Sequence, residues 1–502
     1  MQRSAKLISI SLIALFVSGC AVTTKPLDRT QSEQRSYTDL GVMFRDQEPV
    51  TAPITLHDAM ARALKYNLEA RLKVMEEALA QRQLDLSTFD MLPKMAAEAG
   101  YVTRSNVSAS SSESVLSGTT SLEPSTSQDR NRRVADLTMV WNVLDFGVSY
   151  VTAKQQSDQR WIAEERRRKV IHTIVQDVRS AYWRAVTAER LLTRIDGLID
   201  RVNMARESSQ KMTAQQVGDQ IEALSYQRAL IDATRQLEEQ RKALSLAKTE
   251  LATLMNLPLG TDYKLAMPDE NQLPEPVLNV DFSKLEKAAL ISRPELREQD
   301  YQVRISAAET RKALLRMLPG LELSAGEHHD SNSFLVNQNW ADAGVKVTWN
   351  LFNVLSGPTA QKVAKAGQTV AEARRQAMSM AIMAQLYVAR ANFNEALRQY
   401  HTGEELQKID DKIAGQLRNR YKAGGIGELQ LIQGELNALS TSLRHDLAYA
   451  ELRNAYGQIF ATVGLDPLPK NQAADSLNHI SQVLEQSEHN WDVGDISALQ
   501  PE

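Results

Sequence analysis

Apolar residues recur at helical spacing over most of the chain and alternate at a period of two in only four short stretches. One helical run without Gly or Pro covers 56–89, and a second covers 285–317, with Pro294 placed early, where a helix can begin. A Leu-Pro pair follows each run, and there the period changes from about 3.6 to 2. The pattern therefore predicts two places where a helix leads into a strand.

The four alternating stretches predict amphipathic strands. Their apolar positions are Met95, Ala97, Ala99 and Tyr101; Leu137, Met139, Trp141 and Val143; Leu321, Leu323 and Ala325; and Val345, Val347, Trp349 and Leu351. Strands of about 10 residues match a tilted membrane crossing. Four strands cannot close a barrel, so protomers must assemble. Two copies would supply eight strands and three would supply twelve, and periodicity alone does not choose between them.

Two much longer helices are expected after the second strand of each pair. Helical spacing continues from about 153 to 214, a length on the order of 90 Å. A run of similar length opens at Gly357-Pro358 and ends near Tyr421. Helices this long without internal caps indicate a coiled coil or a helical tube.

The chain contains an internal duplication. Met91-Leu92-Pro93 recurs as Met317-Leu318-Pro319, and 141–145 (Trp-Asn-Val-Leu-Asp) matches 349–353 (Trp-Asn-Leu-Phe-Asn). The copies differ in length mainly in the Ser/Thr-rich segment 105–132, as a surface loop tolerates. We therefore divide the chain into a signal peptide (1–19), a lipidated N-terminal tether (20–53), a first repeat (54–260), a linker (261–284), a second repeat (285–467) and a polar, loosely ordered C-terminal tail (468–502).

Composition favours long helices over a large globular core. The 502 residues include only 22 Gly and 15 Pro, and 43% apolar content is set against 24% charged residues and 6% aromatics. The net charge of −4 argues against a nucleic-acid partner. The chain shows no P-loop, G-x-S-x-G elbow or paired Cys motif, and its eight His residues are scattered. We therefore expect neither an enzyme nor a metal site.

The N-terminus has the features of an export signal. Arg3 and Lys6 precede an apolar run over 7–17 that is too short for a membrane anchor. The only cysteine, Cys20, follows Val-Ser-Gly, which resembles the lipobox of bacterial lipoproteins, so we expect a covalent lipid on Cys20 and no other cofactor. The resemblance also implies outer-membrane sorting, because Ala21 replaces the aspartate associated with inner-membrane retention. An ordinary signal peptide with an incidental cysteine is the alternative.

Together the lipobox, the repeated helix–Leu-Pro–strand units and the Trp-Asn strand ends resemble the TolC-like outer-membrane factor family over about residues 54–466. The resemblance implies a mainly α fold with a small β part. It also implies a homotrimer with a twelve-stranded transmembrane β-barrel in the outer membrane above a long α-helical barrel. Its partners would be a periplasmic adaptor and an inner-membrane transporter. The implied function is passive export through a tripartite efflux or type I secretion system.

The same resemblance indicates a docking site and a constriction. The docking tips would be Val217, Gly218 and Asp219 in the first repeat and Gly424, Gly425 and Gly427 in the second, although any helical hairpin needs such a turn. The family's aspartates beyond the second tip align with Gln430 and Gln433, which carry no charge. An aspartate gate is therefore doubtful unless Glu428 or Glu435 replaces it. Exposed helix-surface residues are the alternative interpretation.

Three other groups of residues have less specific interpretations. We interpret Trp141 and Trp349 as membrane-interface aromatics in preference to substrate contacts. The acidic and histidine residues at 327–330 are expected in an extracellular loop, and the basic run 166–169 mainly on a solvated helix face. The rival function is a lipid-anchored periplasmic coiled-coil lipoprotein that tethers other components, but such a protein has no use for four lipid-facing strands.

Overall fold

The computed structural model describes residues 26–121, 123–214, 220–267, 274–468 and 476–496. The chain divides into two units, Met1–Pro49 and Val50–Glu502. The smaller unit holds helix α2 (Arg29–Met43), which buries none of its side chains. The segment expected to be a polar tether thus contains a helix.

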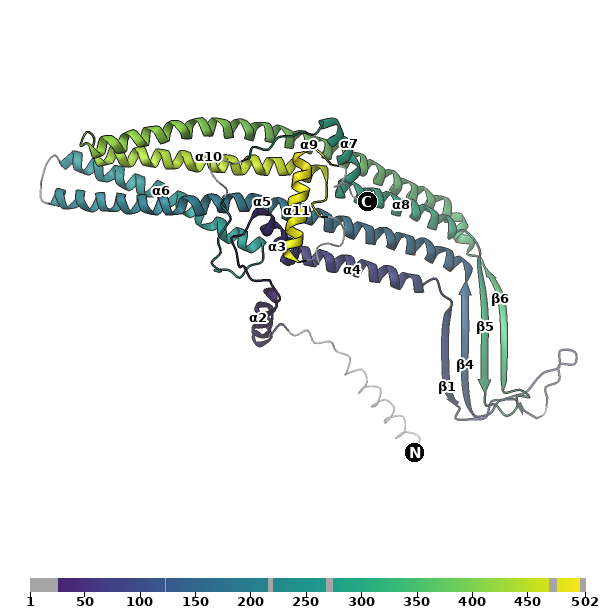
Figure 1. Cartoon of the computed structure of the whole chain (residues 1–502). Coiled ribbons are helices and arrows are strands. Elements are labelled where there is room, and N and C mark those ends of the chain that lie inside the picture. Colours follow the sequence, from purple (N-terminus) through teal and green to yellow (C-terminus); the bar gives the residue numbers. More distant parts are fainter. Residues whose placement is uncertain (1–25, 122, 215–219, 268–273, 469–475, 497–502) are drawn as a thin grey trace. The chain divides into compact units, whose positions relative to one another are not determined.

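The larger unit consists of long helices and a four-stranded sheet (Figure 1). Its principal elements are α3 (Leu56–Tyr66), α4 (Leu68–Phe89), β1 (Lys94–Thr103), β4 (Asn131–Asn142), α5 (Val143–Ala214), α6 (Gln220–Leu254), α7 (Phe282–Ser292), α8 (Pro294–Leu315), β5 (Gly320–Asp330), β6 (Asn339–Thr348), α9 (Leu351–Lys422), α10 (Glu428–Val463) and α11 (Leu477–Asp492). A short ribbon of β2 (Ala109–Ser110) and β3 (Ser125–Thr126) lies in the Ser/Thr-rich segment. The predicted fold class, mainly α with a small β part, is confirmed.

The sheet joins the two repeats. Its order is β1-β4-β5-β6, and every neighbouring pair is antiparallel. The central β4–β5 pairing brings the second strand of the first repeat beside the first strand of the second repeat. All four predicted strands are present, because alternation along the chain already specifies which side chains share a face. Val143 and Leu351, which were expected in strands, instead begin helices α5 and α9.

Two long helices run through the whole helical part. Helix α5 packs against α4, α6, α8 and α10, and α9 packs against α8 and α10. In Figure 1, α4 and α8 accompany α5 and α9 on the side of the strands, and α6 and α10 accompany them in the other half. Among the described residues, none of the helices is both long and apolar enough to cross a membrane.

The long helices begin earlier than the sequence predicted. Helix α9 starts at Leu351, because the Asn350 side chain accepts a hydrogen bond from the Phe352 amide at 3.1 Å, and Pro358 lies inside the helix. Asn142 accepts equivalent bonds from Leu144 and Asp145 at the start of α5. At Gly357 a Cβ atom would lie 2.5 Å from Cγ of Met317. The Gly-Pro pair therefore marks close packing, and the expected helix start there was wrong.

The single helix expected over 56–89 is divided at Asn67. Its backbone is extended, and its side chain accepts hydrogen bonds from the amides of Glu69 and Ala70, which caps α4. The same side chain donates to the carbonyl of Leu254 at 3.2 Å. A contact with a distant part of the chain thus fixes this break.

The C-terminal segment expected to be loosely ordered contains α11. Its apolar residues Leu477, Ile480, Leu484 and Trp491 are spaced for one helix face and all are buried. The first three join the apolar core around α3, α5 and α6, and Trp491 joins the core around α7, α9 and α10. Helix α11 therefore connects the two core clusters, and the prediction of a loose tail was wrong.

Candidate functional site

The two faces of the sheet differ in polarity. One row across the four strands is Met95, Met139, Ala325 and Ala343, and these residues are direct partners in the register. A row on the opposite face, three residues further along the strands, is Glu98, Asp136, His328 and Trp340. One face is thus suited to lipid and the other to water.

Polar contacts cross the strands on the second face. The His328 ring lies 2.5 Å from a carboxylate oxygen of Asp136 and 3.1 Å from one of Asp342, and it stacks on Trp340. His328 was expected in a loop, but strand β5 extends through Asp330, where it pairs with β4 from Glu322 to Asp330. The described residues include no group of three or more His, Cys, Asp or Glu arranged to hold a metal ion.

The sheet has two open edges, β1 and β6. Their unpaired backbone groups cannot face lipid, because nothing there replaces the missing hydrogen bonds. The helices at the same two edges also leave large apolar side chains exposed. On α4 they include Leu72, Val74, Met75, Leu79, Leu86 and Phe89, and on α9 they include Phe352, Leu355, Val363, Val370, Leu406, Ile409 and Ile413. Both edges of the protomer are therefore surfaces that a neighbouring copy could cover.

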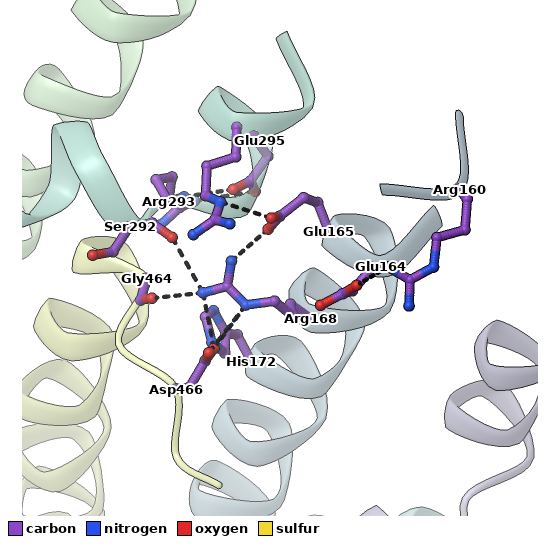
Figure 2. Close-up of polar contacts among 11 residues, drawn as sticks. Arg160, Glu164, Glu165, Arg168, His172, Ser292, Arg293, Glu295, Gly464 and Asp466 are labelled. Carbon is purple, nitrogen blue, oxygen red and sulfur yellow. Dashed lines mark hydrogen bonds and ion pairs between the residues drawn. The ribbon is translucent and has the colours of Figure 1, made fainter. Parts of the chain in front are cut away.

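The buried guanidinium of Arg168 connects α5 to the ends of α7 and α10 (Figure 2). Arg168 of α5 donates to both carboxylate oxygens of Asp466, at 3.0 and 3.1 Å, and to Glu165. It also donates to the carbonyls of Ser292 and Gly464, each at 3.3 Å, which lie at the ends of α7 and α10. One side chain thus satisfies carbonyls that two ending helices leave without intrahelical partners.

Electrostatics favour the ionised form of Asp466, whereas burial raises the pKa of the Glu165 carboxyl. Burial alone would raise the pKa of the Asp466 carboxyl, but the hydrogen bond from His172 and the charge of Arg168 hold that pKa below its usual value. Gly464 closes the cluster with a φ of +79°, and a Cβ there would lie 2.7 Å from the Cα of Arg293. The interpretation of 166–169 as a solvated face was therefore wrong for Arg168, because its partners come from distant segments.

A second buried ion cluster attaches α11 to the long helices. The Glu488 carboxylate lies 2.7 Å from each of three groups: the His57 ring, the Arg179 guanidinium and the Arg453 guanidinium. Burial would raise the pKa of Glu488, but the charges of Arg179, Arg453 and His57 hold it well below its usual range. Four elements, α3, α5, α10 and α11, thus meet at one carboxylate.

The described turn between α9 and α10 fits the predicted tip. Gly424 has a φ of +72°, in the left-handed region that favours glycine, and the Gly425 amide donates to the carbonyl of Arg420 at 2.9 Å. Gly427 precedes α10 in an extended conformation. The first tip, Val217, Gly218 and Asp219, and the lipidation residue Cys20 lie outside the described residues.

The constriction candidates lie at the start of α10. Gln430 and Gln433 are exposed and share one side of the helix, whereas Leu431 and Ile432 between them are buried. Gln433 and Gln458 are separated by about seven helical turns, so Gln458 marks the side of α10 on which Gln433 lies. Arg453 faces α11, and Gln458 is turned about 140° away from it. The glutamines thus lie on the face that points away from α11.

The acidic residues of this region differ in their contacts. Glu428 is half-buried. Burial of the Tyr226 hydroxyl on α6 raises the pKa of that hydroxyl, and the charge of Glu428 raises it further. Glu435 forms ion pairs with Arg201 of α5 and Arg418 of α9. Glu435 is therefore held between the two helical hairpins, α5–α6 and α9–α10, whereas Gln430 and Gln433 carry no charge.

Trp141 and Trp349 stand where the strands meet the helices. Trp349 is 53% exposed, and its ring nitrogen donates to the carbonyl of Met317 at 3.1 Å. Trp141 is half-buried and makes an edge-to-face contact with Phe146. Their assignment to a membrane interface stays a prediction.

Solved structures share this architecture. The Campylobacter jejuni CmeC outer membrane channel matches with a TM-score of 0.64 at 14% identity, covering 93% of this chain and 98% of that one. The open state of the Neisseria gonorrhoeae MtrE outer membrane channel matches at 0.62 and 17% identity, covering 84% and 94%. CusC, described for transmembrane channel formation, matches at 0.63 and 17%, covering 84% and 96%. The chain has the TolC-like outer-membrane factor fold.

The sequence resemblance is thereby confirmed at the level of the fold, which is what identities of 14–17% show. No protein-family model matches the sequence, and no curated protein matches it. The TolC-like fold explains the duplication, because each repeat supplies two strands and one long helix to the same wall.

Sequence reasoning missed two residues that hold this TolC-like wall together, Arg168 and Glu488. Arg168 was hidden in a run of four basic residues, and nothing local distinguishes it from its neighbours. A signal for Glu488 did exist, because the apolar spacing of 477, 480, 484 and 491 indicates a helix whose buried face includes it.

Proposed function

We propose that this protein is an outer-membrane export duct and not an enzyme. Three copies would close their sheets into a twelve-stranded barrel and their helices into a tube. Substrate would pass through it without any energy input from this chain. The driving force would come from an inner-membrane transporter coupled through a periplasmic adaptor, and Cys20 would carry a lipid in the outer membrane.

One observation carries the proposal: a sheet with one apolar face, one polar face and two open edges continues into helices with apolar edges. Apolar side chains suit lipid, the row with Asp136 and His328 suits a water-filled passage, and the edges require a partner. The edge formed by β1 and α4 in one copy would pack against β6 and α9 of the next. Likeness in fold to three solved channel proteins, two of them named as outer membrane channels, supports the duct.

The test is single-channel conductance of the purified, lipidated protein in planar bilayers, together with its mass in detergent. We expect discrete conductance steps from a particle of three protomers. A monomer or dimer that never conducts would refute the duct. If such a protein also left the membrane on Cys20→Ala substitution, the lipid-anchored tether would be the better description.

Because the two faces of the sheet differ in polarity, the same substitution at two adjacent positions is expected to have different effects on stability. Met139→Arg places a charge in the apolar row of Met95, Met139, Ala325 and Ala343, and we expect it to destabilise the inserted barrel by about 2–4 kcal/mol. Thr138→Arg is the matched control on the polar face and should insert nearly as well as the wild type. The measurement is the folded fraction in liposomes across a urea series. Equal effects of both variants would contradict the assignment of the faces.

The uncharged side chains of Gln430 and Gln433 lead to a prediction for the charge selectivity of the proposed constriction. Replacing both with Asp adds two carboxylates per protomer on the face turned away from α11. We expect the cation-to-anion permeability ratio to rise about threefold, because a ring of acidic side chains attracts cations. The reversal potential in a salt gradient measures it. Gln486→Asp on α11 is the control, and an unchanged ratio in the double variant would show that these glutamines do not line the passage.

A further inference from the structure

A cleft of about 390 Å³ lies between α5, α9 and α10, close to the constriction predicted at Gln430 and Gln433. Its lining includes the small residues Gly197 and Ala414 and the charged residues Arg194, Arg201, Arg418 and Glu435. Apart from Gly197, its two neighbours and the adjacent backbone of α5, no described atom lies within 4 Å of the position that a Cβ of Gly197 would take, so the cleft is open there. A side chain from another molecule could enter it.

The charges in the cleft do not balance. The Glu435 carboxylate is the one acidic group in its described lining, and it pairs with Arg201 and, at 3.4 Å, with Arg418. Over the part of the chain that the structure describes, no hydrogen bond or ion pair involves the Arg194 guanidinium. Two guanidiniums therefore share the one carboxylate and that of Arg194 has no carboxylate within the described residues, so a second carboxylate would find charge-assisted donors already in place.

The cleft opens toward the side of α10 that carries α11. Glu435 and Arg453 are separated by about five helical turns, so they share one side of α10, and Arg453 binds Glu488 of α11. Glu435 also lies about 10 Å along the axis from the start of α10 at Glu428. This is the side opposite Gln430 and Gln433. A protein packed along the outer side of the helical hairpins α5–α6 and α9–α10 would contact the cleft.

We propose that this cleft receives an Asp or Glu side chain from a helix of the periplasmic partner. The inference rests on the proposed function, in which an adaptor docks at this end of the duct. The small residues leave room for the side chain, and Arg194 and Arg418 bind its carboxylate. This contact fixes the position of the partner along the hairpins, in addition to any contact at the tips.

Charge reversal at Arg194 tests the proposal in cells whose resistance to an exported compound depends on this protein. We expect Arg194→Glu to lower export about tenfold, because the partner carboxylate then meets a like charge. Arg194→Lys should keep export within about twofold, since the positive charge remains. Arg235→Glu on the exposed face of α6 is the matched control and should behave as the wild type. Trimer-sized mass in detergent verifies that each variant assembles.

Suppressor selection in the Arg194→Glu strain identifies the partner's charge. The expected suppressor changes an Asp or Glu of a periplasmic protein to Lys or Arg and does not improve export by the wild-type duct. Wild-type export by Arg194→Glu would overturn the proposal. Stabilisation of the wild-type protein by inorganic phosphate, lost in Arg194→Glu while export is unchanged, would overturn it in favour of a small-anion site. Failure of the wild-type protein to conduct would instead refute the duct itself.

Discussion

Replacing Arg168 with alanine is expected to lower the free energy of unfolding by about 3–5 kcal/mol, because the substitution leaves buried carboxylates without their counter-charge. Among the described residues, Asp466 would then keep its polar contact with His172 alone, and Glu165 its ion pair with Arg297 alone. The carbonyls of Ser292 and Gly464 would also lose a donor. The joint between α7, α8 and α10 should therefore loosen before the rest of the wall.

The measurement is chemical unfolding in detergent, followed by helical circular dichroism, at one fixed protomer concentration because assembly contributes to apparent stability. Arg166→Ala is the matched control. Arg166 pairs with Glu298 on the surface, its side chain is 55% exposed, and its loss should cost less than about 1 kcal/mol. Equal unfolding midpoints for the two variants would show that the buried network contributes nothing to stability.

Glu488→Gln is expected to have a comparable effect, about 3–5 kcal/mol, at the junction of α11 with the wall. The amide keeps the shape of the side chain but removes the negative charge that Arg179 and Arg453 share. The buried Nε atoms of both arginines have no hydrogen-bond partner in the described structure, so neither guanidinium gains compensation there. Helix α11 should then separate from α3 and α10, which protease cleavage within 476–496 would detect.

The same carboxylate predicts a pH dependence with a definite sign. The folded pKa of Glu488 is well below its ordinary value of 4.5, so its contribution to stability is complete above that value. The contribution is lost as the pH falls below 4.5 and approaches the folded pKa. Asp466, whose pKa is also lowered, acts in the same direction.

Unfolding midpoints measured from pH 7 to pH 3 provide the check. The wild-type protein should lose stability toward acid pH, and Glu488→Gln should lose less because it has no proton to take up at this site. Glu485→Gln, on the exposed face of the same helix, should follow the wild-type curve. Parallel curves for all three proteins would contradict the role of Glu488.

The four strands and their two faces could be predicted from the sequence, since a period of two assigns alternate side chains to opposite faces whatever the strand pairs with. The long helices could also be predicted, because apolar residues at helical spacing share one side of a helix. Their boundaries were less accurate, as at Asn67 and Leu351, because a capping side chain or a distant carbonyl decides them. Strand β5 likewise includes 327–330, where β4 and, up to His329, β6 pair with it.

The sequence by itself thus determined the elements, the duplication and the candidate tips, because these depend on residues that are close in the chain. The tertiary structure alone decided which charged residues are buried and paired. Arg168 and Asp466 are 298 residues apart, and His57 and Glu488 are 431 apart. No local pattern distinguishes such residues from solvated ones, because the burial and the opposite charge that define their role come from segments brought together only by folding.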